Sequence, residues 1–203
     1  MVLNIGGIAN ISILPRNGQV FGFDTGPGNM LMDAWTRKNW QKDYDEGGNF
    51  AACGQVIEPI LTQMLADEYF SRPQPKSTGR DHFNLHWLAK LLRGDESPYD
   101  IQATLLALTA TSITEAISQT ADLTKQIIVC GGGVHNKVLF DCMQTQLPHI
   151  QFDVVDAYGI DSQCVEGAAF AWLARQFTHR LPANVPEVTG ALGPRILGAL
   201  YPA

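Results

Sequence analysis

Several features that would assign this sequence of 203 residues to a secreted or membrane class are missing from it. The four cysteines are scattered and form no C-x-x-C pair, which argues against a zinc site and against a disulfide framework. No apolar run approaches the roughly 20 residues that cross a membrane. No charged segment with a signal-like apolar core opens the chain. We therefore expect a reduced, cytoplasmic protein with no membrane partner.

Positive charge is also scarce. The chain has 14 Lys and Arg against 20 Asp and Glu, which gives a net charge of -6. No basic stripe is present, so nucleic acid is not an expected partner. The remaining composition, 45% hydrophobic with 19 Gly and 11 Pro, is that of a globular chain with one large domain or two small ones.

The first forty residues predict three antiparallel strands followed by a helix. Residues 2–5 and 8–14 are strand-like runs on either side of a Gly-Gly pair, which favours a β-hairpin. A second turn leads to a third strand at 19–23, and a helix is expected from about 28 to 39. Because residues 2–5 already resemble a core strand, we expect the chain to begin in the middle of something longer.

The hairpin glycines could meet a ligand. Gly6 and Gly7 lack Cβ atoms, so a phosphate could lie directly on their backbone amides. A plain hairpin turn is the alternative interpretation of the pair.

A second glycine turn is expected after the third strand, and an aspartate lies just before it. Gly26, Pro27 and Gly28 are expected to force a turn, which would place Asp24 at the carboxyl end of the strand. The free amides and the dipole of the following helix would favour a phosphate there. A carboxylate beside such a turn is a candidate base for a phosphoryl acceptor. The alternative is an aspartate that braces the turn.

Residues 50–97 predict a helical insertion interrupted by Pro and Gly. Within it, Lys76 and Arg80 could meet an anionic ligand or a domain partner, or belong to a surface loop. His82 and His86 have the spacing of metal ligands on a helix, but no Glu of an H-E-x-x-H signature accompanies them, so no metal is assigned.

An acidic loop precedes the insertion. Residues 43–49 could carry a carboxylate that faces magnesium, although a solvated loop is the simpler interpretation.

The second half predicts alternating helices and strands. A long helix from Ser97-Pro98 to about Gln119 precedes an apolar strand at 126–130. The next three residues, Gly131, Gly132 and Gly133, would let a flat ligand approach the backbone closely.

A helix to about residue 146, a strand at 151–155 and a last helix to about Phe177 complete the pattern. Glu166 lies in the first turns of that last helix, where it could orient a water or a substrate hydroxyl, or only complement the helix dipole. The apolar positions expected to form the buried face of this helix are Val165, Ala168, Ala169, Trp172 and Leu173.

The resulting order, βββα, an α insertion and βαβα, predicts an α/β lobe of the ribonuclease-H-like fold found in sugar kinases and actin. Two such lobes clamp a nucleotide in that superfamily, and the second lobe supplies a hairpin phosphate loop and a glycine-rich adenosine loop. The pair Gly6-Gly7 and the run 131–133 fall where that second lobe would need them.

Longer motifs carry a closer resemblance. They run in order along essentially the whole chain: NIGGIAN (4–10), GFDTGPGN (22–29), PKSTGR (75–80), CGGGVHN (130–136), EGAAFAWL (166–173) and VTGA (188–191). Together they resemble the anhydro-N-acetylmuramic acid kinase family. The resemblance covers only the carboxyl-terminal half of that family's chain, so residues 1–203 are expected to be its second lobe. The first lobe, with its Gly-Thr-Ser-x-Asp-Gly ATP loop and a basic residue that helps hold the sugar acid, is absent.

The resemblance implies a reaction in which ATP phosphorylates O6 of 1,6-anhydro-N-acetylmuramate while water opens the anhydro bridge at C1. The product is N-acetylmuramate 6-phosphate, in peptidoglycan recycling. Asp24 matches the catalytic base, and Glu166 matches an acidic residue that helps hold the water.

The resemblance also implies the remaining site assignments. The substrate would lie against Asp24, Thr25, Gly26 and Glu166. The cofactors would be ATP and Mg²⁺, with the nucleotide held by Gly6, Gly7, Gly131, Gly132, Gly133 and Asn136. The amino sugar, the missing first lobe and a second copy in a homodimer are the expected partners.

Two other interpretations stay open. The chain could be a truncated nucleotide-binding or interaction module without catalysis, or it could belong to another sugar or acyl kinase of the superfamily. In the anhydro-N-acetylmuramic acid kinase interpretation, we expect this chain to be incomplete for activity by itself.

Overall fold

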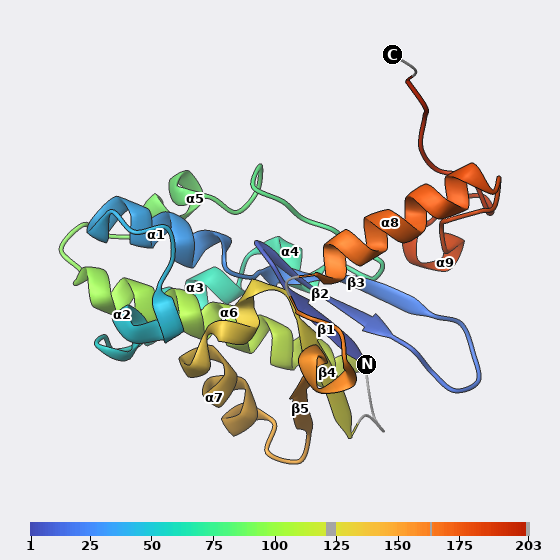
Figure 1. Ribbon diagram of the computed structural model, residues 1–203. Helices are drawn as coiled ribbons and strands as arrows, with labels where there is room; N and C mark the ends of the chain where they lie inside the picture. The colour runs from blue at the N-terminus through green and yellow to red at the C-terminus, as the bar shows by residue number, and fades with distance from the viewer. Residues whose placement is uncertain (121–124, 163, 202–203) are drawn as a thin grey trace.

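The computed structural model describes residues 1–120, 125–162 and 164–201. Its centre is a five-stranded sheet (Figure 1). The strands are β1 (Val2–Ile5), β2 (Ile8–Ile13), β3 (Phe21–Pro27), β4 (Gln126–Cys130) and β5 (Gln151–Val154). The α-helices are α1 (Met30–Trp40), α2 (Asn49–Ala52), α3 (Glu58–Leu65), α4 (Glu68–Ser71), α5 (Leu85–Ala89), α6 (Pro98–Thr120), α7 (Lys137–Gln146), α8 (Val165–Thr178) and α9 (Pro186–Thr189). Short 3-10 helices are η1 (Glu46–Gly48), η2 (Gly132–His135) and η3 (Val155–Tyr158).

The sheet has the strand order β3-β2-β1-β4-β5. The first three strands are antiparallel neighbours, and β4 and β5 are both parallel to β1. This mixed order, an antiparallel meander extended by parallel strands after helical crossovers, is that of the ribonuclease-H-like fold. The predicted fold class is therefore confirmed.

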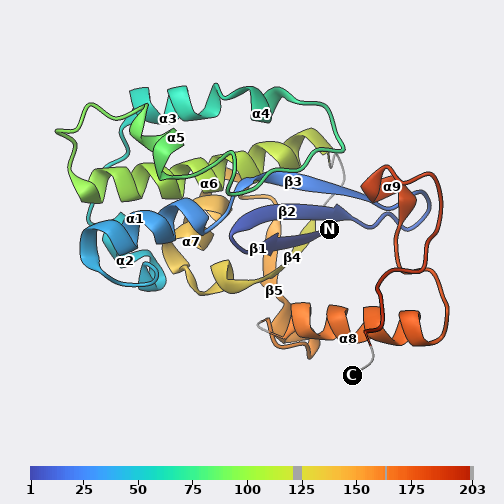
Figure 2. The ribbon, with the colours of Figure 1, turned by 90° about the horizontal axis from the view of Figure 1, so that it is seen from above.

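One face of the sheet carries the hydrophobic core. Phe23, Ile11, Leu3 and Val129 pair in turn across β3, β2, β1 and β4, and all four are buried. Helix α6 lies on this face, between the sheet and helix α3 (Figure 2). Because it is covered from both sides, α6 buries residues around most of its circumference, as a central helix does.

The third strand does not end where it was expected to. Instead of turning after Phe23, β3 continues to Pro27, which pairs with Ile8. This is possible because β3 is an edge strand, where a proline without an N–H costs no ladder hydrogen bond. Asp24 therefore lies inside a strand, and not at its carboxyl end.

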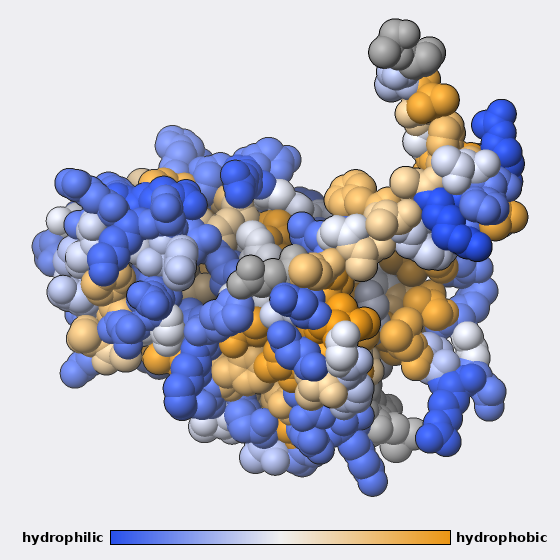
Figure 3. All heavy atoms as spheres, in the orientation of Figure 1, coloured by the Kyte–Doolittle hydropathy of each residue, from blue (hydrophilic) through white to orange (hydrophobic). Residues whose placement is uncertain are grey.

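Helix α8 also departs from expectation. None of its residues is buried, although five apolar positions were expected to form a buried face. Phe170 and Trp172 are 70% and 48% exposed. The apolar spacing is present, but burial needs a covering surface, and α8 extends on the side of the sheet opposite α6 (Figures 1 and 2). Figure 3 shows apolar atoms along α8 and beneath it.

Within the described part of the chain, no helix combines the length and the apolar character needed to span a bilayer.

Candidate active site

Asp24 belongs to a polar row that crosses the sheet on the face opposite the core. It pairs with Asn10 on β2, Asn10 pairs with Asn4 on β1, and Asn4 pairs with Cys130 on β4. Paired residues point to the same face of a sheet. Because neighbouring strands lie about 4.8 Å apart, the row is about 14 Å long. It forms a polar floor with one carboxylate at its β3 end.

The Asp24 residue is held by three hydrogen bonds from the helical insertion. The Thr78 N–H donates to Asp24 Oδ2 at 2.9 Å, and the Asp24 N–H donates to the Lys76 carbonyl at 3.0 Å. The Tyr69 hydroxyl donates to the Asp24 carbonyl at 2.6 Å. Burial raises the pKa of Asp24, and the Thr78 hydrogen bond works against that rise. The carboxyl is thus fixed in position and made more basic than an exposed aspartate.

The two residues after Asp24 form a β-bulge. Asp24 pairs with Asn10 and Gly26 with Ala9, so Thr25 is the extra residue between them. Thr25 is buried, and its hydroxyl donates to the Ala9 carbonyl. Gly26 has φ +150°, and a Cβ there would stand 2.8 Å from the Phe70 ring. Both residues shape the strand beside the carboxylate, and a direct contact between them and a substrate stays a prediction.

The hairpin tip packs on the start of α1. The carbonyl of Gly7 accepts the N–H groups of Gly28 and Met30, and the carbonyl of Gly6 accepts that of Asn29. At residues 28–30 the expected free amides are therefore absent, because the hairpin carbonyls accept their hydrogen bonds. Gly7 itself is exposed, so a phosphate contact at the tip stays a prediction.

The three glycines after β4 have different surroundings. Gly131 has φ +83°, and a Cβ there would lie 2.4 Å from Asn4 Oδ1. A Cβ on Gly133 would lie 2.3 Å from the Ile5 side chain. A Cβ on Gly132 would have only Asn29 Nδ2 within 4 Å, at 3.9 Å. The outer two glycines therefore permit close packing against β1, whereas Gly132 leaves room for a ligand.

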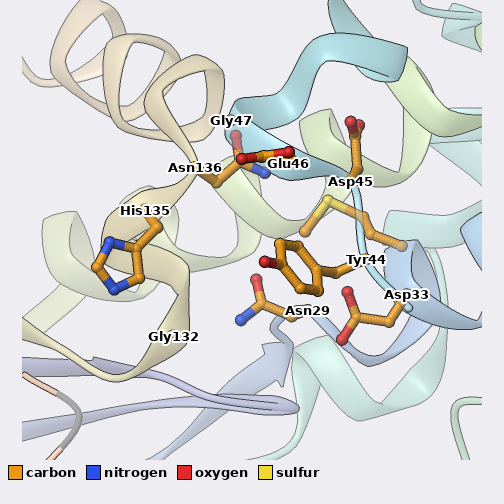
Figure 4. A pocket seen from close by; sticks show the side chains of 10 residues that line it. Asn29, Asp33, Tyr44, Asp45, Glu46, Gly47, Gly132, His135 and Asn136 are labelled. Carbon is orange, nitrogen blue, oxygen red and sulfur yellow. The ribbon is translucent and has the colours of Figure 1, made fainter. Parts of the chain in front are cut away.

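A cavity of about 620 Å³ opens at Gly132 (Figure 4). One wall comes from the start of α1 and the acidic loop, and the other from η2 and Asn136, which caps α7 by accepting the Leu139 N–H. The lining residues are Asn29, Met32, Asp33, Tyr44, Asp45, Glu46, Gly47, Gly132, His135 and Asn136. Of the predicted nucleotide residues, the cavity brings together Gly132 and Asn136.

Asn29, Asp33 and Tyr44 line this cavity but were not predicted as site residues. Burial raises the pKa of Asp33 to about 6, and the charges of Arg37 and Arg80 oppose that rise. The sequence spacing does not identify Asn29 or Asp33 as site residues, because it indicates only an amphipathic helix. Tyr44 lies in the loop at 43–49. By contrast, Asp45 is buried and accepts the N–H groups at 50 and 51, so it stabilises the loop. The loop at 43–49 is consequently a cavity wall as well as a surface loop.

A second cavity, of about 470 Å³, contains Asp24. It lies between β2, β3, the loop at 75–77 and α9. Its lining residues are Asn10, Ile11, Ser12, Gly22, Phe23, Asp24, Pro75, Lys76, Ser77, Val188 and Thr189. Two separate stretches of sequence, PKSTGR and VTGA, thereby meet over the carboxylate.

Lys76 and Arg80, left undecided from the sequence, differ in their surroundings. The Lys76 ammonium donates to the carbonyls of Tyr69 and Phe70 at 3.1 and 2.9 Å and lies over the Tyr69 ring. It therefore holds the end of α4. Arg80 is exposed, and its charge opposes the rise in the pKa of Asp33 in the first cavity.

Glu166 stands at the other end of the polar row from Asp24. Glu166 is exposed in the first turn of α8. Burial of Cys130 raises the pKa of its thiol, and the nearby negative charge of Glu166 raises that pKa further. Cys130 and Asp24 are about 14 Å apart by strand spacing. Glu166 therefore does not reach Asp24, and it lines neither of the two cavities described above.

The histidine pair does not form a metal pair. His82 Nε2 lies 3.0 Å from Asp67 Oδ1, within a cluster inside the insertion. Among the described residues, no three His, Cys, Asp or Glu side chains are grouped so that they could hold a metal ion.

The sheet order, the glycine turns and the carboxylate-bearing bulge define a lobe of the ribonuclease-H-like class to which sugar kinases and actin belong. The family model for anhydro-N-acetylmuramic acid kinase matches residues 1–203, and the chain belongs to this family. The predicted family is thereby confirmed.

Curated relatives agree with this assignment. The anhydro-N-acetylmuramic acid kinase of Nitrosomonas europaea is 51% identical over 203 residues, which are 100% of this chain and 56% of that protein. The one from Chromohalobacter salexigens is 50% identical over 99% of this chain and 56% of its own length. The chain therefore spans about half the length of the curated relatives it matches. Among solved structures, the activator of 2-hydroxyisocaproyl-CoA dehydratase from Clostridium difficile has a TM-score of 0.45 at 16% identity, covering 75% of this chain and 52% of that one.

Proposed function

We propose that this chain is one lobe of a kinase that converts 1,6-anhydro-N-acetylmuramate and water to N-acetylmuramate 6-phosphate at the expense of ATP. The observation that carries the proposal is Asp24, a half-buried carboxylate fixed by the Thr78 amide on the floor of a cavity. Membership in a family whose relatives bear this name supports it. The chain would be the lobe that provides the hairpin and adenosine loops.

The nucleotide would lie at the first cavity. Gly132 offers a surface without a side chain, and Asn29, His135 and Asn136 offer polar groups around it. A volume of about 620 Å³ suits a nucleoside, since ligand pockets commonly measure about 300–1,000 Å³. The phosphates would run from there past the exposed Gly7 towards the polar row. Mg²⁺ would neutralise charge on the phosphates and would be held mainly by their oxygens and water.

The sugar would lie at the second cavity, with Asp24 as the general base. Asp24 would take a proton from the water that attacks C1 of the anhydro sugar. The C1–O6 bond then breaks, O6 forms its bond to the γ-phosphorus, and ADP leaves. Burial makes the carboxylate more basic, while the Thr78 amide favours its ionised form, so the residue is ready to accept the proton.

Glu166 would help to hold the attacking water. With α8 placed as it is, the glutamate faces the Cys130 end of the row. The role therefore requires α8 to move towards the sheet, and such a movement would also cover exposed apolar side chains such as Trp172.

The test compares this chain alone with this chain mixed with the part of the Nitrosomonas europaea relative that it does not match. The assay follows ATP-dependent formation of the 6-phosphate by mass spectrometry. We expect turnover only in the mixture, and an Asp24→Asn substitution should lower it by about 10²–10⁴-fold. The exposed Asp95→Asn substitution is the matched control. Full activity of the lone chain would contradict the one-lobe proposal, and full activity of Asp24→Asn would contradict the base.

Tight binding of nucleotide by the mixture, with no product from the anhydro sugar, would instead favour a non-catalytic module. Turnover of other amino sugars or small acids in place of the anhydro sugar would favour another kinase of the superfamily.

A further inference from the structure

The helical insertion contacts Asp24 from two directions. Tyr69, on α4, reaches the carbonyl of Asp24, and the loop at 76–78 reaches both its N–H group and its carboxylate. These residues lie 45 to 54 positions further along the chain than Asp24. An edge strand has one side unpaired, and here the insertion occupies that side at Asp24.

The contacting groups are themselves held firmly. Tyr69 is completely buried, and its N–H donates to Asp67 at 2.9 Å. The other Asp67 oxygen accepts from Trp87 Nε1 at 2.8 Å, and His82 lies against the same carboxylate. The Lys76 ammonium binds the last carbonyls of α4. The groups that touch Asp24 therefore belong to one hydrogen-bonded cluster and not to a loose loop.

We propose that this cluster positions the catalytic base: Tyr69 and the backbone of residues 76–78 fix the Asp24 carboxylate in the orientation that proton transfer needs. The inference rests on the proposed function, because it takes Asp24 as the base. Tyr69 and Thr78 are positioning residues, since they act through Asp24 and not on the substrate. The helical insertion would thus be part of the catalytic apparatus.

The geometry assigns separate roles to the two carboxylate oxygens. The Thr78 N–H occupies Oδ2, which leaves Oδ1 to accept the proton from water. The remaining groups around the carboxylate carry little charge. Among the described residues that line the cavity, Lys76 is the only other charged one, and its ammonium is directed to the end of α4. Strand β2 and helix α9 contribute the uncharged Asn10, Val188 and Thr189. Burial raises the pKa of Tyr69, so its hydroxyl stays a donor at neutral pH.

The experiment measures the pKa of Asp24 directly, by ¹³C NMR titration of its carboxyl carbon in this chain. Replacing Thr78 by its α-hydroxy acid removes the N–H and keeps the side chain. We expect the pKa of Asp24 to rise by about one unit, because a hydrogen bond that favours the ionised form is lost. Thr78→Val is the matched control. It keeps the N–H and removes a buried hydroxyl that has no partner among the described residues, so the pKa should stay the same.

A second readout uses turnover in the two-part mixture. The ester variant should shift the acid limb of kcat/KM upwards by the same amount as the NMR pKa. Tyr69→Phe should lower kcat at least threefold with KM for ATP unchanged. Tyr158→Phe, which removes a hydroxyl bonded to Asp153 far from the cavity, should do neither.

Each result has a definite meaning. An unchanged pKa in the ester variant overturns the positioning role, whether or not Asp24 is the base. A raised pKa with an unchanged pH profile overturns the base, and the proposed function with it. If the ester variant fails to fold, Tyr69→Phe decides alone, and full kcat would overturn the proposal.

Discussion

Gly131 and Asn4 lie so close together that a Cβ at position 131 would stand 2.4 Å from Asn4 Oδ1. The contact joins the end of β4 to the end of β1, next to the first cavity. It also explains why a glycine is needed there: the residue has φ +83°, where other residues are strained.

Gly131→Ala should therefore destabilise the chain, by about 1–3 kcal/mol, through strain and overlap. Gly132→Ala is the matched control, because its nearest neighbour would be 3.9 Å away. It should change stability by less than about 0.5 kcal/mol. Urea unfolding followed by circular dichroism measures both. Equal stability of the two variants would contradict the packing argument.

Much of the fold could be predicted from sequence because its signals are local. The hairpin, the long α6 and the apolar β4 follow from glycine pairs, capping residues and periodicity. The extent of β3 could not be predicted, because the bulge at Thr25 depends on pairing with another strand. Burial of α8 could not be judged either, since an apolar stripe does not tell what covers it.

The site was predictable only in part, for a similar reason. Asp24 and Glu166 are predicted from motifs, but the groups that contact Asp24 come from distant segments. The Thr78 amide reaches Asp24 across 54 positions, and a backbone N–H leaves no mark in a sequence. The cavity wall formed by Asp33 and Tyr44 exists only because the loop at 43–49 lies beside the start of α1.

Asp33 should make stability depend on pH. Burial raises its pKa from 3.8 to about 6, so the folded chain binds the proton more tightly than the unfolded chain does. Its contribution is therefore most favourable below about pH 4 and is lost as the pH rises to about 6. Asp33→Asn should stabilise the chain at pH 7 by about 1 kcal/mol after solvent screening, and should have little effect at pH 4. Unfolding midpoints at both pH values measure this. The exposed Asp95→Asn should show no such difference, and a pH-independent effect of Asp33→Asn would contradict the assignment.

Lys76→Met tests whether Lys76 is structural. The substitution keeps the aliphatic stem and removes the donor to two α4 carbonyls, so it should cost about 1–2 kcal/mol of stability. Lys90→Met, at an exposed site, should be neutral. The free energy of unfolding of both variants is the measurement. Unchanged stability of Lys76→Met, with weaker binding of an anionic ligand, would assign Lys76 to ligand binding instead.

Two tryptophans, one buried and one exposed, test whether an apolar side chain stabilises this chain only where it is buried. Trp35 is 7% exposed, and its indole N–H donates to the Pro98 carbonyl at 2.9 Å. Trp35→Ala should therefore cost about 3–5 kcal/mol. Trp172, on α8, is 48% exposed, so Trp172→Ala should change the stability of this chain by less than about 1 kcal/mol. Thermal and urea unfolding of the two variants decide the matter. A large loss for Trp172→Ala in the lone chain would mean that α8 packs on the sheet in solution, with Glu166 correspondingly nearer to Asp24.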